Sequence, residues 1–253
     1  MYNLGNVGFP ICKIVGESKL NNKIVSMTEN EDDEYIRYVK EIQLEGNNVF
    51  ELVPNTKADR DVIYYAGPSG SGKSFAMASY LRNYKKTFKE RPVYLFSEKE
   101  SDDVLDSIKD LKRVKMDEQM INDPLDLKDF NEEPCCVVFD DIDSLEKKLK
   151  VAVYTLLNKL LKVGRSYKIS VLVSSHSSCD GASTKSMLNE SSIIVFYPTC
   201  YNRSIKYLCE NYIGLNKKDI EKLRSHKSRW CAYVKTFPSC IVQEKNIFSF
   251  GKD

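Results

Sequence analysis

The sequence predicts an α/β protein in which a mostly parallel sheet is flanked by helices. Between residues 61 and 200, apolar runs of strand length alternate with helical patterns, an order typical of parallel sheets covered on both faces. A glycine-rich loop separates the first apolar run from the first helical pattern. Short apolar runs and turn residues flank this core, and they predict N-terminal β-hairpins and a C-terminal extension of helices and a β-hairpin.

Composition limits the classes of protein that need considering. The chain has 253 residues, of which 42% are apolar and 29% charged, with a net charge of +2, as in a globular protein. Nucleic acid would therefore have to meet a local basic patch or an assembled ring. Since no apolar run is long enough to cross a bilayer and the N-terminus lacks a leader pattern, we expect no membrane span and no secretion signal. The eight cysteines form no C-x-x-C pair, which favours reduced, buried thiols.

Residues 1–60 predict a small β-rich extension. Strand-like runs at 10–16 and 23–27 flank a turn, and residues 28–34 are an acidic loop. Runs at 38–44 and 49–53 flank Glu45-Gly46-Asn47-Asn48, which indicates a second hairpin. Because such short strands bury little surface on their own, we expect an extension rather than an independent domain.

The core begins with a predicted phosphate-binding loop. An apolar strand at residues 62–66 precedes it and a helix at 75–88 follows it. The loop fits G-x-x-x-x-G-K-[ST] without a mismatch and reads Gly67-Pro68-Ser69-Gly70-Ser71-Gly72-Lys73-Ser74. Glycines let successive N–H groups face an anion, and the helix N-terminus adds partial positive charge. Lys73 would reach the β- and γ-phosphates, and the Ser74 hydroxyl would bind Mg²⁺.

Weaker signals follow this helix. Residues 93–97 predict a strand, and residues 102–111 have apolar positions at helical spacing. Residues 113–116 predict a short strand and residues 125–130 a helical turn. These elements continue the alternation that a parallel sheet requires.

Two carboxylates follow the next buried strand. The apolar run at residues 135–139 ends at Asp140-Asp141, and ligands of open α/β sheets bind at the carboxyl ends of strands. Asp140 would hold Mg²⁺ directly or through water, and Asp141 would polarise the attacking water as general base. The alternative is a solvated acidic turn, since Asp143 follows closely.

A helix and another buried strand come next. Residues 145–163 carry an apolar stripe at helical spacing, and residues 169–176 predict a strand that ends in polar residues. His176 would sense the γ-phosphate or orient the water, or it is a hydrogen-bonded loop histidine. Arg165 lies at the opposite end of that strand, which favours an arginine finger supplied to a neighbouring subunit; a surface salt bridge is the alternative.

The rest of the chain predicts a Ser/Gly-rich loop and a C-terminal extension. Residues 177–190 form a loop with a short helix near its end, where Lys185 is a candidate contact for a polymer. A last core strand covers residues 192–197. Helices at 201–214 and 217–225 and strands at 228–235, 241–244 and 247–250 follow. Lysines and arginines between 206 and 229 indicate a solvated helical face or a nucleic-acid patch.

Several of these segments together are similar to one known family. They are the loop at 67–74, the Asp140-Asp141 strand end, residues 164–170 leading into 171–176, residues 207–215, and Ser228-Arg229-Trp230. The sequence resembles the A32-like genome-packaging ATPases of large DNA viruses, in the FtsK–HerA superfamily of P-loop ATPases. The resemblance extends over about residues 49 to 250.

This resemblance implies a RecA-like core that assembles into a homo-oligomeric ring and moves double-stranded DNA with ATP. It places Lys73 and Ser74 on nucleotide and Mg²⁺, Asp140 on Mg²⁺, and Asp141 beside the water. Relatives often carry Gln as the sensor, where this chain has His176. Arg203 and Arg229 compete with Arg165 for the finger role.

The function that these residues and the resemblance imply is a motor that packages viral DNA into the capsid during virion assembly, with DNA-stimulated ATP hydrolysis. We expect it in the host cytoplasm or viral factory, or retained in the virion, with capsid or portal-vertex proteins as further partners. Two alternatives stay open, a P-loop kinase acting on a nucleotide or other small acceptor and a low-turnover nucleotide-binding virion component.

The expected parts are a β-rich extension at 1–60, an ATPase core at 61–200, and C-terminal helices with a β-hairpin at 201–253. The candidate catalytic residues are Lys73, Asp141, Arg165 and His176, and the candidate metal ligands are Ser74 and Asp140. The candidate nucleotide-binding residues are Gly67, Pro68, Ser69, Gly70, Ser71, Gly72, Lys73, Ser74 and Phe75.

Overall fold

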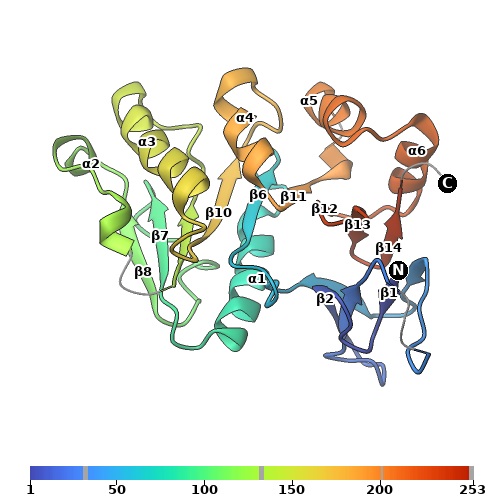
Figure 1. Ribbon diagram of the computed structural model, residues 1–253. Helices are drawn as coiled ribbons and strands as arrows, with labels where there is room; N and C mark the ends of the chain where they lie inside the picture. The colour runs from blue at the N-terminus through green and yellow to red at the C-terminus, as the bar shows by residue number, and fades with distance from the viewer. Residues whose placement is uncertain (31–33, 131–133, 201, 251–253) are drawn as a thin grey trace. The chain divides into compact units, whose positions relative to one another are not determined.

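The computed structural model describes residues 1–30, 34–130, 134–200 and 202–250 (Figure 1). The chain divides into two compact units. One unit is Ala58–Ser191, and the other combines Met1–Lys57 with Ser192–Asp253. The first unit contains the predicted phosphate-binding loop and both carboxylates, so it holds the candidate site.

Five parallel strands form the sheet of the unit Ala58–Ser191. Their order across the sheet is β6, β10, β9, β7, β8, and each neighbouring pair is parallel. The strands are β6 (Val62–Ala66), β7 (Val93–Ser97), β8 (Leu111–Lys115), β9 (Cys136–Phe139) and β10 (Ser170–Ser175). Apolar residues dominate β6, β7, β9 and β10, which are almost wholly buried. The mostly parallel sheet expected from the sequence is confirmed.

Helices cover both faces of these strands. Helix α1 (Lys73–Thr87) connects β6 to β7, and α3 (Lys147–Val163) connects β9 to β10 in the opposite direction across the sheet. Right-handed crossovers place two such helices on opposite faces, as Figure 1 shows. Shorter elements complete the unit: α2 (Gln119–Asn122), the 3₁₀ turn η1 (Leu127–Phe130) and α4 (Gly181–Glu190). Because all five strands run the same way, their carboxyl ends share one edge.

The predicted helix at residues 102–111 is wrong. The segment forms turns, and its last residue begins β8. The Asp102 carboxylate accepts hydrogen bonds from the N–H groups of Val104 and Leu105, both at 3.0 Å, and such side-chain bonds compete with helical ones. Leu105 and Ile108 are nevertheless buried, so the apolar spacing identified core residues of a non-helical segment.

The second unit contains two antiparallel sheets. One has the order β1 (Tyr2–Asn3), β3 (Ile24–Met27), β2 (Phe9–Val15), β5 (Val49–Leu52). In the other, the order is β4 (Glu41–Gln43), β14 (Asn246–Ser249), β13 (Cys240–Gln243), β12 (Cys231–Val234), β11 (Ile193–Phe196). Segments from both ends of the chain therefore build this unit together.

The predicted hairpin across residues 45–48 is also wrong. Strand β4 pairs with β14, and β5 pairs with β2 in the other sheet. These partners place Phe50 opposite Ile14 and Ile42 opposite Ile247, and such apolar cross-strand pairs stabilise a sheet. Burial against distant partners therefore outweighs the local turn signal.

The remaining helices belong to this second unit. They are the 3₁₀ turn η2 (Pro198–Cys200), α5 (Arg203–Tyr207), its π-helical continuation η3 (Leu208–Ile213), and α6 (Lys217–Ser225). Asn216 and Asp219 form a capping box at the start of α6, which satisfies N–H groups of its first turn. Within the described ranges, no helix combines the length and apolar character that a membrane span would need.

Candidate functional site

The loop at residues 67–72 connects β6 to α1 at the carboxyl edge of the sheet. Gly70 and Gly72 have φ angles of 73° and 101°, which side chains with a Cβ rarely adopt. The Gly67 N–H donates to the Ser175 carbonyl at 3.1 Å and ties the loop to β10. In the part of the chain that the structure describes, the buried Ser71 hydroxyl has no hydrogen-bond partner, so this loop retains unused polar capacity.

Lys73, the first residue of α1, folds back over this loop. It is only 6% exposed, and its Nζ donates to the carbonyl oxygens of Gly67 at 2.9 Å and Pro68 at 3.4 Å. The same Nζ lies 3.4 Å from Asp141 Oδ1. Lys73 therefore joins the phosphate-binding loop to the carboxylates. The next two residues are more accessible, since Ser74 is half-buried and Phe75 is 68% exposed.

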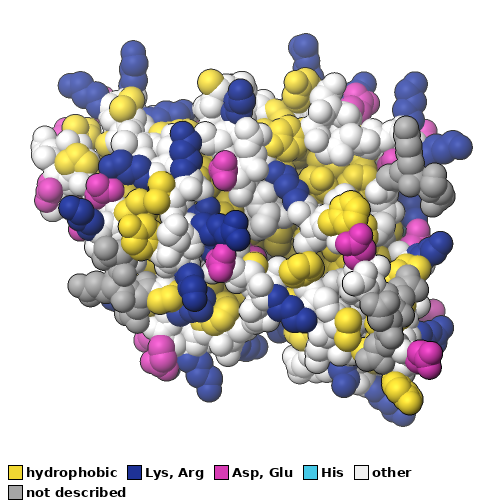
Figure 2. Space-filling model, viewed as in Figure 1, with side chains coloured by type: hydrophobic (Ala, Val, Ile, Leu, Met, Phe, Trp, Pro, Cys, Tyr) yellow, Lys and Arg dark blue, Asp and Glu magenta, His cyan; other side chains and the backbone are white. Residues whose placement is uncertain are grey.

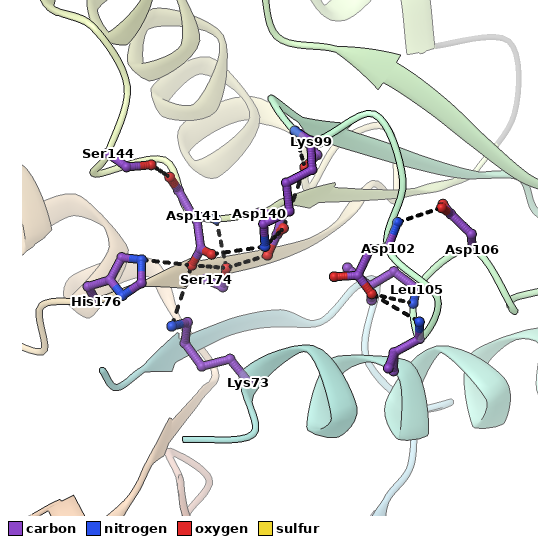
Figure 3. A network of polar contacts seen from close by, with 12 residues as sticks. Lys73, Lys99, Asp102, Leu105, Asp106, Asp140, Asp141, Ser144, Ser174 and His176 are labelled. Carbon is purple, nitrogen blue, oxygen red and sulfur yellow. Dashed lines mark hydrogen bonds and ion pairs between the residues drawn. The ribbon is translucent and has the colours of Figure 1, made fainter. Parts of the chain in front are cut away.

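Asp140 and Asp141 leave β9 toward the same point (Figure 3). Asp140 is 2% exposed, and its Oδ1 accepts a hydrogen bond from Ser174 Oγ at 3.0 Å. Asp141 has a φ of 52°, and its N–H donates to the same Ser174 Oγ at 2.8 Å. This turn at the end of β9, held by a hydroxyl of β10, directs both carboxylates to the sheet edge.

Three cationic or ionisable groups surround the Asp141 carboxylate. Lys99 Nζ lies 3.3 Å from its Oδ2, and His176 Nε2 lies 3.5 Å from its Oδ1, beside Lys73. Burial raises the pKa of Asp141, but Lys73, His176 and Lys99 together lower it by more, so the pKa of Asp141 is below its ordinary value. Asp141 is therefore a carboxylate at neutral pH, able to accept a hydrogen bond from water.

Asp143 fixes the end of β10. Its Oδ2 accepts hydrogen bonds from Ser175 Oγ at 3.1 Å and from the His176 N–H at 2.8 Å. This carboxylate therefore orders the segment that carries His176, instead of belonging to a solvated acidic turn as the alternative interpretation required. The role was missed because it depends on β9 and β10 being neighbours.

Lys99 and Ser174 were also missed as site residues. Lys99 follows β7, and its Nζ lies 3.2 Å from Asp140 Oδ2 as well as near Asp141. Burial lowers the pKa of Lys99, but the two carboxylates raise it by more, so its net pKa is above the ordinary value. The only sequence signal was position, since both residues stand at or just after the ends of predicted strands.

Arg165 is remote from this group of residues in its own chain. It follows α3, at the end of β10 opposite His176, and its Nε donates to Asp59 Oδ2 at 2.9 Å. The Arg165 side chain is 78% exposed. Within one chain it therefore forms a surface ion pair. Arg203 and Arg229 belong to the other compact unit.

The described residues contain no cluster of three or more His, Cys, Asp or Glu side chains suited to a metal ion. A hydroxyl at Ser74 and a carboxylate at Asp140 are hard oxygen donors. Mg²⁺ is commonly bound in this way, by one or two protein ligands together with phosphates and water. The donor set therefore fits a metal that arrives with a nucleotide.

Comparison with known proteins gives a clear sequence relative. The chain is 36% identical over 217 residues to "Uncharacterized protein V3" of Sputnik virophage, an alignment that covers 82% of this chain and 86% of that protein. No protein-family profile matches the chain.

Solved structures of other proteins share the fold. The crystal structure of B204, the DNA-packaging ATPase of Sulfolobus turreted icosahedral virus, aligns with a TM-score of 0.52 at 15% identity, covering 74% of this chain and 98% of B204. The cytoplasmic domain of the type VII secretion ATPase EccC of Thermomonospora curvata aligns with a TM-score of 0.51 at 12% identity, covering 81% of this chain and 28% of EccC. At these identities the likeness concerns the fold.

These findings confirm the fold that the resemblance implied. The fold is that of a P-loop ATPase core. Its sheet carries the loop between β6 and α1 and the two carboxylates after β9. The chain belongs to the same family as protein V3 of Sputnik virophage, and its fold is that of the viral genome-packaging ATPase B204 and of EccC-type ATPases.

Proposed function

We propose that the protein is an ATP-hydrolysing motor that moves double-stranded viral DNA into a capsid during virion assembly. The observation that carries this proposal is the 3.4 Å approach of Lys73 Nζ to Asp141 Oδ1, beside the buried Asp140. One residue comes from the phosphate-binding loop and the others from the end of β9. Their convergence is what hydrolysis of a nucleoside triphosphate requires.

The residues of the loop fit a magnesium nucleotide. The Ser71 hydroxyl, which has no hydrogen-bond partner among the described residues, is a donor available to phosphate oxygens. Lys73 donates to carbonyl oxygens that phosphate oxygens would replace. Residues 67–72, with Ser74 and Phe75 at the start of α1, complete the proposed nucleotide site. The backbone N–H groups of residues 69–72 are the proposed donors to phosphate. Ser74 and Asp140 would hold Mg²⁺, which neutralises phosphate charge when bound.

Two residues would act on the attacking water. Asp141 is the proposed general base, and the depressed pKa of its carboxyl keeps it deprotonated at neutral pH. His176 lies 3.5 Å from Asp141 Oδ1, so we propose that it detects the terminal phosphate or orients the attacking water. The Asp143 carboxylate would support His176 by accepting a hydrogen bond from the His176 backbone N–H.

Double-stranded DNA is the proposed polymer substrate, and α3 offers a surface for it. Residues 147–168 contain no Asp or Glu. They contain seven cationic residues: Lys147, Lys148, Lys150, Lys159, Lys162, Arg165 and Lys168. The opposite side of α3 buries leucines, and Lys147, Lys148 and Lys162 are exposed. Figure 2 shows Lys and Arg side chains where α3 lies in Figure 1. Such a surface suits a phosphate backbone.

A homo-oligomeric ring is the proposed assembly. Arg165 is exposed and lies at the end of β10 away from the carboxylates of its own chain. In a ring, Arg165 would act as an arginine finger, reaching the nucleotide bound by the neighbouring subunit. Capsid or portal-vertex proteins are further proposed partners, and the host cytoplasm or viral factory is the proposed site of action.

The direct test is phosphate release from ATP, with and without long duplex DNA at low salt. We expect DNA to increase turnover, and Lys73→Ala to abolish it while the circular dichroism spectrum persists. Full turnover by Lys73→Ala would remove Lys73 from the mechanism. Turnover indifferent to DNA would argue against a motor, and transfer of phosphate to a small acceptor without phosphate release would identify a kinase.

A further inference from the structure

The Lys99 ammonium occupies the space between the two carboxylates of the site. Its Nζ lies 3.2 Å from Asp140 Oδ2 and 3.3 Å from Asp141 Oδ2. Figure 3 shows the side chain reaching from the loop after β7 toward both residues. Lys73 contacts Asp141 through the other oxygen, Oδ1. Lys99 is therefore the cation that bridges Asp140 and Asp141.

Contacts of the backbone hold Lys99 in this position. Its N–H donates to Ser97 Oγ at 3.2 Å, and its carbonyl accepts a hydrogen bond from Arg113 Nη1 at 2.8 Å. Arg113 is in turn paired with Asp106. Both polar groups of the Lys99 backbone are thus satisfied by neighbouring side chains, and the ammonium approaches the carboxylates from a fixed point.

The charge balance explains why a cation is needed there. Asp140 is almost fully buried, and a buried carboxylate is costly without a positive partner or hydrogen bonds. A divalent metal on Asp140 would supply that positive charge, and it would repel an ammonium held at the same carboxylate. The Lys99 side chain is 48% exposed, so its flexible stem can carry the ammonium into solvent when a metal arrives.

We propose that Lys99 occupies the metal site of the nucleotide-free protein with its own positive charge. It neutralises Asp140 and Asp141, disfavours a metal ion that comes alone, and is displaced when Mg²⁺ arrives already bound to the triphosphate. This inference rests on the proposed nucleotide site. Lys99 would thereby join the residues of that site and determine the order in which metal and nucleotide bind.

Binding of Mn²⁺ to the nucleotide-free protein tests the proposal, measured as loss of the free Mn²⁺ signal in electron paramagnetic resonance. We expect Lys99→Met to bind Mn²⁺ at least about tenfold more tightly than the unaltered protein, because a competing charge is gone. Lys99→Arg keeps the charge and should bind no more tightly than the unaltered protein. Adding Asp140→Asn to Lys99→Met should abolish the gain.

The matched control is Lys115→Met. Lys115 pairs with Glu100, and both side chains are exposed, so the control removes a nearby cation without touching the carboxylates. Equal Mn²⁺ affinity of Lys99→Met and the unaltered protein would overturn the proposal. So would weaker ATP binding by Lys99→Met with unchanged Mn²⁺ affinity, since Lys99 would then contact the nucleotide. Failure of the unaltered protein to bind ATP would instead refute the proposed function.

Discussion

Asp143 connects the turn after β9 to the end of β10, at the periphery of the site. Its carboxylate accepts from Ser175 Oγ and from the His176 N–H, and β10 ends there. Removing an acceptor leaves partly buried donors unpaired, which costs about 1–3 kcal/mol. The consequence reaches the chemistry because His176 stands beside Asp141.

Replacement of Asp143 by alanine should therefore lower both stability and turnover. We expect a loss of about 1–3 kcal/mol in the free energy of unfolding, together with a fall in kcat that exceeds any change in ATP affinity. Asp143→Asn keeps an acceptor oxygen and should recover most of both. Asp103→Ala, at an exposed position of the same unit, is the control. Unchanged kcat in a folded Asp143→Ala protein would contradict the role.

Single residues were predictable where a motif fixes their chemistry. The spacing of glycines around Lys73 and the position of Asp140 after an apolar strand were enough to place both at one edge of the sheet. Lys99 was not predictable, because its contact with Asp140 exists only if β7 lies next to β9. Strand order is a property of the whole sheet, and no residue of the Glu98-Lys99 loop encodes it.

At the scale of elements, α3 combines a structural and a charged face. Its apolar stripe is buried, as the spacing predicted: Leu149, Val153, Leu156, Leu157, Leu160 and Leu161. The helix begins at Lys147, two residues after the predicted start, and ends at Val163 as predicted. A helix this long with a continuous stripe is easily recognised because burial and periodicity agree.

Truncation of this stripe should destabilise the protein. Leu157 is 1% exposed, and Leu157→Ala should cost about 2–5 kcal/mol through reduced burial and the cavity left behind. Val151 on the same helix is 64% exposed, and Val151→Ala should change stability by less than about 0.5 kcal/mol. Denaturant unfolding of both variants makes the comparison, and equal effects would refute the observed orientation of α3.

Elements stabilised by local side-chain bonds or distant partners were predicted poorly. Residues 102–111 have helical spacing, yet the Asp102 carboxylate binds backbone N–H groups of the same segment. The turn at residues 45–48 resembles a hairpin connection, yet its flanking strands enter different sheets. In both cases the deciding contacts lie outside the pattern that sequence periodicity measures.

At the scale of the whole molecule, the charges of α3 predict how DNA binding responds to salt. Neutralising three exposed lysines with Lys147→Gln, Lys148→Gln and Lys162→Gln should weaken binding of duplex DNA. It should also reduce the slope of log K against log salt by about 0.9 for each DNA phosphate that the variant no longer neutralises. Filter binding over a salt series provides the measurement.

The control for this experiment removes the same charge elsewhere. Lys217→Gln, Lys218→Gln and Lys227→Gln alter exposed lysines of the C-terminal basic segment. If this second variant loses the salt dependence and the α3 variant keeps it, DNA meets the C-terminal segment and not α3. That segment is the one for which sequence analysis raised a nucleic-acid patch.

Assembly should be visible through Arg165. Because its ion pair with Asp59 is exposed, Arg165→Ala should leave stability almost unchanged, retain ATP binding, and lower turnover by on the order of 10³-fold or more. Mixing it with the Lys73→Ala protein should restore turnover, since each supplies what the other lacks. Asp59→Ala should stay active. A mixture no more active than its components would contradict a finger acting between subunits.

Lys73, Asp140 and Asp141 are proposed to bind one magnesium triphosphate together, and a crystal structure with Mg²⁺ and a non-hydrolysable ATP analogue would show whether they do. We expect Lys73 Nζ on the β- and γ-phosphates, Asp140 bound to Mg²⁺ directly or through one water, and Lys99 withdrawn from Asp140. A nucleotide bound away from residues 67–74, or a metal held without Asp140, would contradict this proposal.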